Sequence, residues 1–208
     1  MASPALKPEL VPILFVNIKD IEKPRQLTKG DLNVGSFDWS PDGAKIVYDH
    51  TEIPTANSSS TSNISIVGLA SGSSRVIVDW GGFDASPKFS NDGKRIAFVS
   101  DGDNPSWGRE HYVYTASSSG VRKKKLQPTP SKYVNAIEGW SPDDSYIIVQ
   151  EANKTSRRYF YVPSSVGGSV SAITIGPGNF SNLSYNQFGQ MVFVHEQLNV
   201  PANVFTLP

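Results

Sequence analysis

The sequence predicts an all-β protein, a β-propeller of about four antiparallel blades with four strands each. Two observations support this prediction. One segment, consisting of an aromatic residue, a polar turn and an apolar strand, occurs four times, and helical periodicity is absent along the chain. Strands this short cannot bury an apolar face alone, so four-stranded units are expected to stack radially as blades.

The repeated segment has the same order of residue types in every copy. Its aromatic residues lie 50, 51 and 45 positions apart. A β-sandwich of unrelated strands does not require a turn motif to recur in this way, so the recurrence favours a propeller. The four copies are FDWSPDGAKIVYDHTE from Phe37, PKFSNDGKRIAFVSDGD from Pro87, EGWSPDDSYIIVQEAN from Glu138 and LSYNQFGQMVFVHEQL from Leu183, with the aromatic residues Trp39, Phe89, Trp140 and Tyr185.

The turn inside each copy has a chemical reason to reverse the chain. Asp and Gly accept the tight or left-handed backbone of a hairpin, and Pro41 and Pro142 fix φ at the start of the turn. The turn residues are Asp42-Gly43, Asn91-Asp92-Gly93, Asp143-Asp144 and Phe188-Gly189. Because these aspartates belong to separate blades, we expect them to form turns and not a catalytic carboxylate pair.

Further strand-like stretches complete each unit. They start at Asn63 and Arg75 in the first unit, at His111 and Val121 in the second, and at Arg158 and Val170 in the third. The predicted division of a single propeller region, residues 1–208, is the end of a preceding blade at 1–30, blades at 31–83, 84–132 and 133–178, and an incomplete last blade at 179–208.

The strand candidates at the two ends of the chain allow two interpretations of the propeller. Strand candidates start at Ile13 and Arg25 before the first full unit, and at Asn182, Met191 and Val204 after the third. They could join into one composite blade that closes a four-bladed ring and covers the open edges. Five candidates for four places favour an arc from a larger propeller instead.

The aromatic residue, the SPDG-type turn and a strand such as RIAFVSDGD resemble the repeat of TolB-like propellers. They resemble more closely the non-catalytic propeller of prolyl oligopeptidase family serine peptidases, with acylaminoacyl-peptidases and dipeptidyl aminopeptidases as the nearest members. The resemblance extends from about Ile13 to Leu207. The final segment, MVFVHEQLNVPANVFTLP, is similar to the last propeller strands of those peptidases.

This resemblance implies a propeller that caps an α/β-hydrolase domain in the same polypeptide and limits which peptides reach its active site. The chain lacks the Gly-x-Ser-x-Gly elbow which that chemistry requires, and the nearest match, Gly167-Gly168-Ser169-Val170-Ser171, is predicted to be a turn. We therefore predict no catalytic, cofactor-binding or metal-binding residues in this chain. The alternative function is a stand-alone TolB-like propeller whose loops bind a protein or carbohydrate partner.

Composition and charge argue against several classes of partner and chemistry. Lys+Arg and Asp+Glu are both 19, so the formal net charge is zero, and neither nucleic acid nor an anionic membrane is an expected partner. The chain has no cysteine, which excludes disulfides and thiolate chemistry. Pro8, Glu9 and Pro12 interrupt any signal-peptide core, so the default compartment is the cytoplasm.

Several further residue patterns could suggest a site, and each has a second explanation. His50 with Glu52, His111, and His195 with Glu196 are expected to reflect blade geometry and not catalysis. The stretch Asp101-Gly102-Asp103-Asn104 lacks the spacing of a calcium loop, although Trp107 and Arg109 in the same loop could contact a ligand or a neighbouring domain. The basic run Arg122–Lys125 is expected on an outer strand, where charge prevents edge pairing.

Two polar patterns have simple explanations. The stretch Thr55–Ser62 is expected to be a flexible loop between strands. Five Asn-x-Ser/Thr triplets would accept glycans in a secreted protein, but serine is so frequent here that chance explains most of them. They begin at Asn57, Asn63, Asn153, Asn179 and Asn182.

Overall fold

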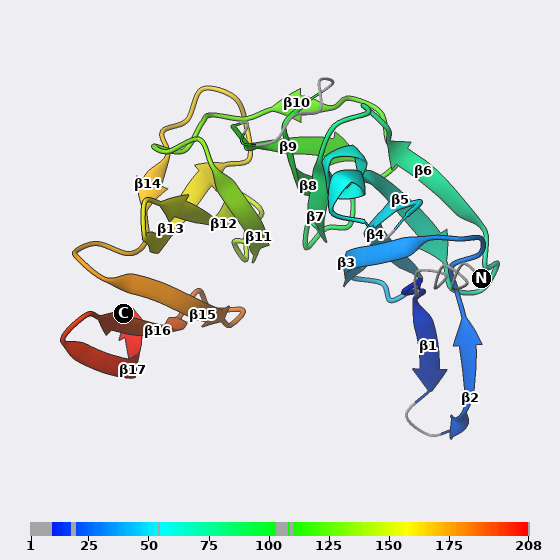
Figure 1. The fold of residues 1–208 in the computed structure, drawn as a ribbon, viewed down its shortest axis with the longest axis horizontal. Coiled ribbons are helices and arrows are strands. Elements are labelled where there is room, and N and C mark those ends of the chain that lie inside the picture. The colour runs from blue at the N-terminus through cyan, green and yellow to red at the C-terminus, as the bar shows by residue number, and fades with distance from the viewer. Residues whose placement is uncertain (1–9, 18–19, 54, 103–107, 109, 208) are drawn as a thin grey trace, which may run out of the picture.

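The protein folds as an open arc of small antiparallel sheets, which confirms the predicted propeller architecture (Figure 1). The computed structural model describes residues 10–17, 20–53, 55–102, 108 and 110–207. These residues form three sheets of four strands, one of three and one of two. Neighbouring strands in each sheet follow one another in sequence, as in propeller blades.

The three complete sheets are called blades 1, 2 and 3. In each, the first strand lies innermost in the arc and the fourth lies outermost (Figure 1). Blade 1 contains β3 (Asn33–Trp39), β4 (Lys45–Thr51), β5 (Asn63–Gly68) and β6 (Ser74–Val78); blade 2 contains β7 (Asp84–Phe89), β8 (Arg95–Ser100), β9 (Tyr112–Ser117) and β10 (Lys124–Lys125); blade 3 contains β11 (Val134–Trp140), β12 (Tyr146–Asn153), β13 (Ser156–Pro163) and β14 (Ser171–Ala172).

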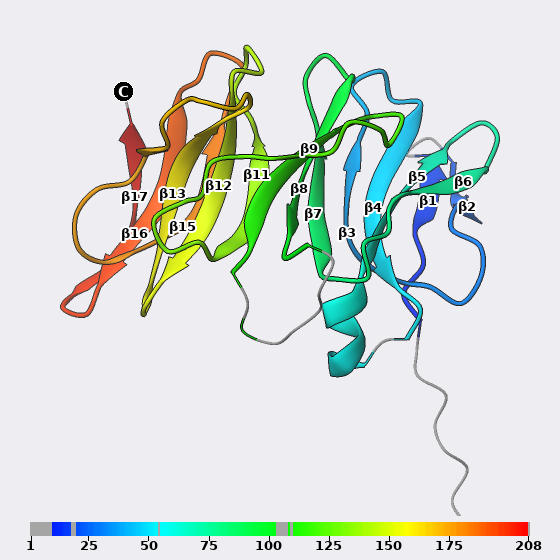
Figure 2. The same ribbon diagram turned by 90° about the horizontal axis from the view of Figure 1, so that it is seen from above.

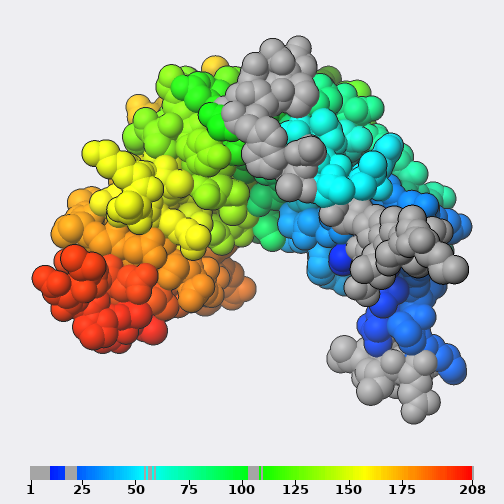
Figure 3. All heavy atoms as spheres, viewed as in Figure 1, coloured from blue at the N-terminus to red at the C-terminus, as the bar shows by residue number. Residues whose placement is uncertain are grey.

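Two smaller sheets form the ends of the arc (Figure 3). The N-terminal sheet pairs β1 (Leu14–Asn17) with β2 (Asp20–Gln26). The C-terminal sheet contains β15 (Asn179–Tyr185), β16 (Met191–Gln197) and β17 (Val200–Leu207). Among the described strands, none of the N-terminal sheet pairs with the C-terminal sheet, so the composite blade of the ring-closing interpretation does not form.

The repeated turn is held by the same hydrogen bonds in each blade. In blade 1, the Ser40 hydroxyl donates to Asp42 Oδ1 at 2.5 Å and accepts from the Lys45 N–H at 2.9 Å, while Asp42 Oδ1 accepts from the Ala44 N–H at 3.0 Å. Ser90 and Ser141 repeat this arrangement. The hydroxyl and amide donors lower the pKa of Asp42, and they lower that of Asp143 to about 2.

The core lies between blades because successive residues of each second strand point to opposite neighbours. In β4, Ile46 and Tyr48 pack toward the N-terminal sheet, whereas Val47 packs against blade 2. The same alternation continues through β8 and β12 to the C-terminal sheet. Each blade is therefore buried on both faces only where it has two neighbours.

Three elements differ from the sequence-based expectation. The fourth strands of blades 2 and 3 are only two residues long, and Arg122 has a left-handed φ of 58° that delays the start of β10. The stretch expected to be a flexible loop contains a 3₁₀ helix, η1 (Ala56–Thr61). Serine and threonine form this helix by local bonds, such as the one that the Thr61 hydroxyl donates to the Ser58 carbonyl at 3.1 Å.

One end of the blades carries the longer connections. The Ser-Asp turns join first and second strands at one end, so the connections from second to third strands leave at the opposite end. Figure 2 shows η1, which joins β4 to β5, projecting from this end. We call this end of the blades the loop face. Loops held over a rigid scaffold commonly carry binding and catalytic residues.

Candidate functional site

The innermost strands bring irregular backbone to the axis side of the arc. Pairing of β3, β7, β11 and β15 with their second strands is interrupted by register shifts, as at Val34/Phe37 in β3 and Ala85/Lys88 in β7. Such bulges free backbone groups from the ladder and turn them toward other partners. The candidate site is built where these bulges meet on blades 1 and 2.

Asp49 is the central side chain of this site. It lies near the end of β4, is almost fully buried, and accepts hydrogen bonds from Ser36 N–H at 3.1 Å, the Ser36 hydroxyl and Ser86 N–H at 3.0 Å. Burial raises the pKa of Asp49, and the donors on Ser36 and Ser86 oppose this effect. Glycine at position 35 gives the carboxylate room, because a Cβ there would overlap Asp49 and force its carboxylate to move.

Ser86 extends this network from blade 1 to blade 3. Its φ of 54° is left-handed, which is uncommon for serine and marks the centre of the β7 bulge. Its amide donates to Asp49 of blade 1, and its hydroxyl accepts from Ile137 N–H of blade 3 at 2.9 Å. The bulged backbone of blades 2 and 3 is therefore bonded by the preceding blade, whereas Ser36 of blade 1 bonds Asp49 of its own blade, and together these bonds fix the geometry of the site.

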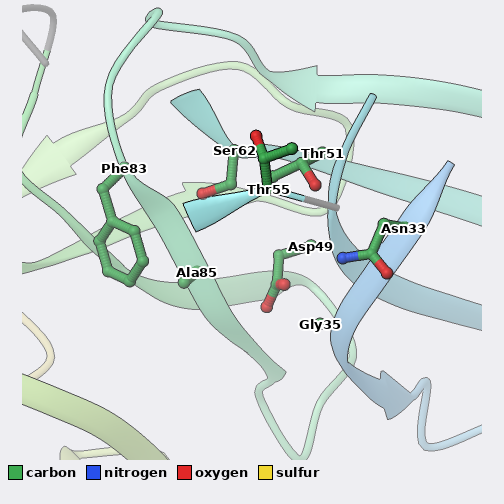
Figure 4. Close-up of a pocket in the computed structure, with 8 residues that line it drawn as sticks. All are labelled: Asn33, Gly35, Asp49, Thr51, Thr55, Ser62, Phe83 and Ala85. Carbon is green, nitrogen blue, oxygen red and sulfur yellow. The ribbon is translucent and has the colours of Figure 1, made fainter. Parts of the chain in front are cut away.

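A pocket of about 340 Å³ opens beside Asp49 on the loop face (Figure 4). Its lining combines one amide, three hydroxyls, one carboxylate and one aromatic ring, and it contains no lysine or arginine. Such a lining suits a polar ligand that is neutral or positively charged. The lining residues are Asn33, Gly35, Asp49, Thr51, Thr55, Ser62, Phe83 and Ala85.

The aromatic wall of the pocket is fixed by stacking. The ring of Phe83 stacks on His111 with a centroid distance of 4.8 Å, and His111 stacks on Tyr133 at 4.6 Å. Phe83 N–H donates to Asp101 Oδ1 at 2.7 Å, and Ser62 bonds the backbone of the adjacent Asp84. These contacts join the pocket to the interfaces on both sides of blade 2.

The three histidines lie in or beside different sheets and do not meet among the described residues. His50 Nε2 bonds the hydroxyl of Ser65 at 2.8 Å, but both residues are buried and His50 Nδ1 has no described partner. His195 Nε2 bonds the Pro177 carbonyl at 2.9 Å. Burial lowers the pKa of His50 and of His111. A Ser–His pair without access or an orienting group is poorly suited to nucleophilic catalysis.

The other candidates are placed as follows. Gly167 and Gly168 lie in the connection between β13 and β14, as does Ser169. Lys124 and Lys125 form β10, the outermost strand of blade 2, and Lys125 lies over the Tyr112 ring at 3.1 Å. Trp107 and Arg109 lie outside the described residues, as do Asp103 and Asn104.

Metal-ligand clusters and membrane-spanning helices are both absent from the described residues. No group of three or more histidine, aspartate or glutamate side chains there is arranged to hold a metal ion. No helix in that part of the chain has the length and apolar character needed to cross a membrane. The acceptor triplets at Asn63 and Asn179 lie within strands, and Asn179 uses its amide to bond Glu196 and Arg157.

The sequence did not single out Asn33, Asp49 or Phe83. The sequence did not reveal Asp49, because its carboxylate bonds the bulged backbone of two different blades. A bulge has no recognisable local sequence pattern. Asp84 could be recognised only in part. Strand pairing places Val34, Val134 and Phe180 at its position in the other sheets. Aligning the sequence copies on their aromatic residues instead places the polar Asn135 there, so the exception becomes clear only with the register shift of β11.

Comparison with known proteins identifies two peptidase relatives. Dipeptidyl-peptidase 5 of Porphyromonas gingivalis is 31% identical over 157 residues, which cover 73% of this chain and 22% of that protein. The uncharacterised peptidase YuxL of Bacillus subtilis is 30% identical over 118 residues, covering 57% of this chain and 17% of that protein. This chain spans about a fifth of the length of these relatives. No family model matches it.

A solved structure supports the propeller fold of this chain. TolB from Acinetobacter baumannii superposes with a TM-score of 0.73 and 21% identity over 98% of this chain and 47% of its own. At this identity the likeness establishes the fold alone. Together with the two relatives, it identifies the chain as a TolB-like propeller region homologous to part of a peptidase, as the sequence resemblance implied.

Proposed function

We propose that this propeller region limits the access of peptides to an α/β-hydrolase domain of a prolyl oligopeptidase-like serine peptidase. The hydrolase domain would belong to the same polypeptide. The observation that carries the proposal is the pocket on the loop face, which is lined by hydrogen-bonding groups around the buried Asp49. The homology to segments of two peptidases supports the reaction class.

The lining of the pocket suits an extended peptide. The Asn33 amide can pair with peptide N–H and C=O groups, which require partners when they leave water. The Thr51 hydroxyl, which donates to the Ile53 carbonyl at 3.1 Å, and the Thr55 hydroxyl, which bonds Ser58 at 2.9 Å, can still accept from a peptide N–H. Phe83 provides an apolar wall for one side chain (Figure 4). Because the lining lacks a basic residue, acidic peptides are expected to bind least.

The test is a titration of the 208-residue protein with short peptides, followed by NMR chemical shifts and isothermal titration calorimetry. Shifts are expected to centre on Asn33, Thr51 and Phe83. The double variant Asn33→Ala/Thr51→Val should weaken binding roughly tenfold, because two hydrogen-bonding groups are lost. Asn199→Ala, which removes an exposed amide from the turn between β16 and β17, is the matched control and should bind like the wild type.

Competing ligands decide between functions. Binding of neutral oligosaccharides with no peptide binding would replace the proposal by a carbohydrate-binding propeller. Shifts that avoid the pocket would also contradict it. Sequencing the coding region on both sides of codons 1–208 tests the hydrolase partner, which must contain a Gly-x-Ser-x-Gly segment.

A further inference from the structure

The hydrogen bonds around Asp49 include a charge that the blade interface itself does not need. Ser36, Ser86 and Ile137 occupy the same position in the first strands of blades 1, 2 and 3, three residues before the aromatic residue of each copy. Between blades 2 and 3, the Ser86 hydroxyl accepts from Ile137 N–H at 2.9 Å. Between blades 1 and 2, the Ser36 hydroxyl bonds Asp49 instead, and Asp49 accepts from Ser86 N–H at 3.0 Å. A serine hydroxyl is sufficient at this position, so the interface does not require a carboxylate.

The neighbouring blade has an apolar side chain where blade 1 has Asp49. Asp49 and Val99 both lie ten residues after the aromatic residue of their repeat, and Val99 is fully buried. None of the ion pairs among the described residues includes Asp49. Burying a carboxylate without a cation costs free energy. Asp49 therefore leaves a place for a positive charge that a ligand would supply.

Three polar side chains of the pocket lie on one face of blade 1. Asn33 is paired with Thr51 in the ladder of β3 and β4, and Asp49 precedes Thr51 by two residues. Side chains two residues apart on a strand point to the same face. Asp49 bonds Ser86 of blade 2, so this is the face that meets blade 2. The amide, the hydroxyl and the carboxylate therefore line the same wall of the pocket (Figure 4).

Two hydroxyl groups of the lining have already used their hydrogens. The Thr51 hydroxyl donates to the Ile53 carbonyl at 3.1 Å, and the Ser62 hydroxyl donates to the Asp84 carbonyl at 2.8 Å. Each of these oxygens can therefore accept from a ligand but cannot donate to it. Asp49 Oδ1 accepts one described hydrogen bond and has a second lone pair. A lining of acceptors suits a ligand group that carries several donors and a positive charge, as an ammonium group does.

The opposite wall of the pocket is apolar and suits the stem of such a group. Phe83, just before β7, and Ala85, within β7, form this wall, and the stack on His111 holds the Phe83 ring in place. A lysine side chain has an apolar stem with an ammonium group at its end, so it matches both walls at once. The amino terminus of a peptide has no such stem, so it would reach the buried Asp49 less well.

We propose that this pocket binds the side chain of a lysine residue in a peptide, with its stem against Phe83 and its ammonium group on Asp49 Oδ1. The oxygens of Thr51 and Ser62 can accept from the other N–H groups of the ammonium, and Asn33 remains for the peptide main chain. The inference rests on the proposed peptide-binding function and specifies the class of peptide that the propeller region selects.

An NMR titration of the 208-residue protein at pH 7.5 tests this with three small probes. Nα-acetyl-lysine N-methylamide has the stem and the ammonium group, Nα-acetyl-norleucine N-methylamide has the stem alone, and alanine N-methylamide has only an amino-terminal ammonium group. The lysine probe should bind roughly tenfold more tightly than either of the others, because it adds a charged hydrogen bond to the apolar contact. Its shifts should centre on Asp49 and Phe83.

Two variants show whether Asp49 causes the preference. Asp49→Asn should remove the advantage of the lysine probe and leave binding of the norleucine probe unchanged. Asp79→Asn, which removes an exposed carboxylate between β6 and β7, is the matched control and should keep the advantage. Thermal melting shows whether Asp49→Asn is folded. If it is not, the carbon-13 shift of the Asp49 carboxyl in the wild type gives a second measurement, because a bound ammonium group should lower the pKa of Asp49 and norleucine should not.

The results separate this inference from the proposed function. Equal binding of the lysine and norleucine probes overturns the lysine preference and leaves peptide binding in place. An advantage that persists in Asp49→Asn, or a pKa of Asp49 that the lysine probe does not lower, also overturns it. Tighter binding of alanine N-methylamide would assign Asp49 to a peptide amino terminus instead. If neither these probes nor longer peptides bind, both proposals fail.

Discussion

Asp84 places a carboxyl group where the other sheets place apolar side chains. It is fully buried at the interface of blades 1 and 2, and neither of its carboxylate oxygens has a well-formed hydrogen bond from the described residues. Burial raises its pKa to about 7, and the nearby Ser100 hydroxyl and Trp80 amide only partly oppose this. A buried carboxyl without strong donors is stable in its neutral form.

This pKa predicts a loss of stability as the pH rises. In the unfolded chain Asp84 ionises near its ordinary value of 3.8, whereas in the folded chain it keeps its proton up to about pH 7. The folded state therefore binds more protons between these values, so the free energy of unfolding falls across this window and is flat above it. The full loss is roughly 4 kcal/mol as an upper figure.

Asp84→Asn should remove this component of the pH dependence and stabilise the protein at pH 7.5. Urea unfolding of the wild type and the variant at a series of pH values from 4 to 8 measures the difference. Asp79→Asn, an exposed aspartate between β6 and β7, is the control and should keep the wild-type slope. Identical slopes for the wild type and Asp84→Asn would contradict the argument.

At the scale of the element, the turn of blade 3 shows why one copy departs from the Ser-Pro-Asp-Gly pattern. Asp144 stands at the glycine position with a left-handed φ of 58°, which costs a non-glycine residue about 1 kcal/mol. Its carboxylate accepts from Asn91 N–H and Nδ2 at 2.8 Å and from Asp92 N–H at 3.0 Å. The turn of blade 2 is thereby held by the turn of blade 3.

We expect Asp144→Gly to destabilise the protein although it relieves the backbone. The loss of charged hydrogen bonds exceeds the relief, and the free energy of unfolding should fall by about 1–2 kcal/mol. Gly43→Asp places the same residue at the equivalent turn of blade 1, where no described turn precedes it, and should cost about 1 kcal/mol through φ alone. Chemical denaturation measures both. If Asp144→Gly were more stable than the wild type, the bonds of the Asp144 carboxylate to Asn91 and Asp92 would not stabilise the protein.

The same elements show how far sequence alone could go. The turn motif predicted the four hairpins because its chemistry is local, with Ser40, Asp42 and Gly43 satisfying one another within six residues. The short fourth strands were not predictable. The β-branched residues after Val170 favour a longer strand, but β14 at the edge of blade 3 contains two residues only. The pocket was not predictable either, since Asp49 and Ser86 meet only through two bulges in different blades.

At the scale of the whole molecule, the arc behaves as a row of units, each stabilised by its neighbours. The most extensive buried cluster lies between blades 2 and 3, while the C-terminal sheet is covered on one side only. In repeat architectures stability is a sum of unit and interface contributions, so the position of a residue in the row determines what it contributes.

Two valines at the same repeat position test this directly. Val47 is fully buried between blades 1 and 2, whereas Val192 is 40% exposed on the C-terminal sheet. Val47→Ala should lower the free energy of unfolding by about 2 kcal/mol, since it leaves a cavity, and Val192→Ala by less than about 0.5 kcal/mol in dilute solution. Thermal unfolding of both variants and the wild type measures the two losses. Equal losses would contradict this view, because a valine exposed on one face of the C-terminal sheet would then contribute as much to stability as one buried between two blades.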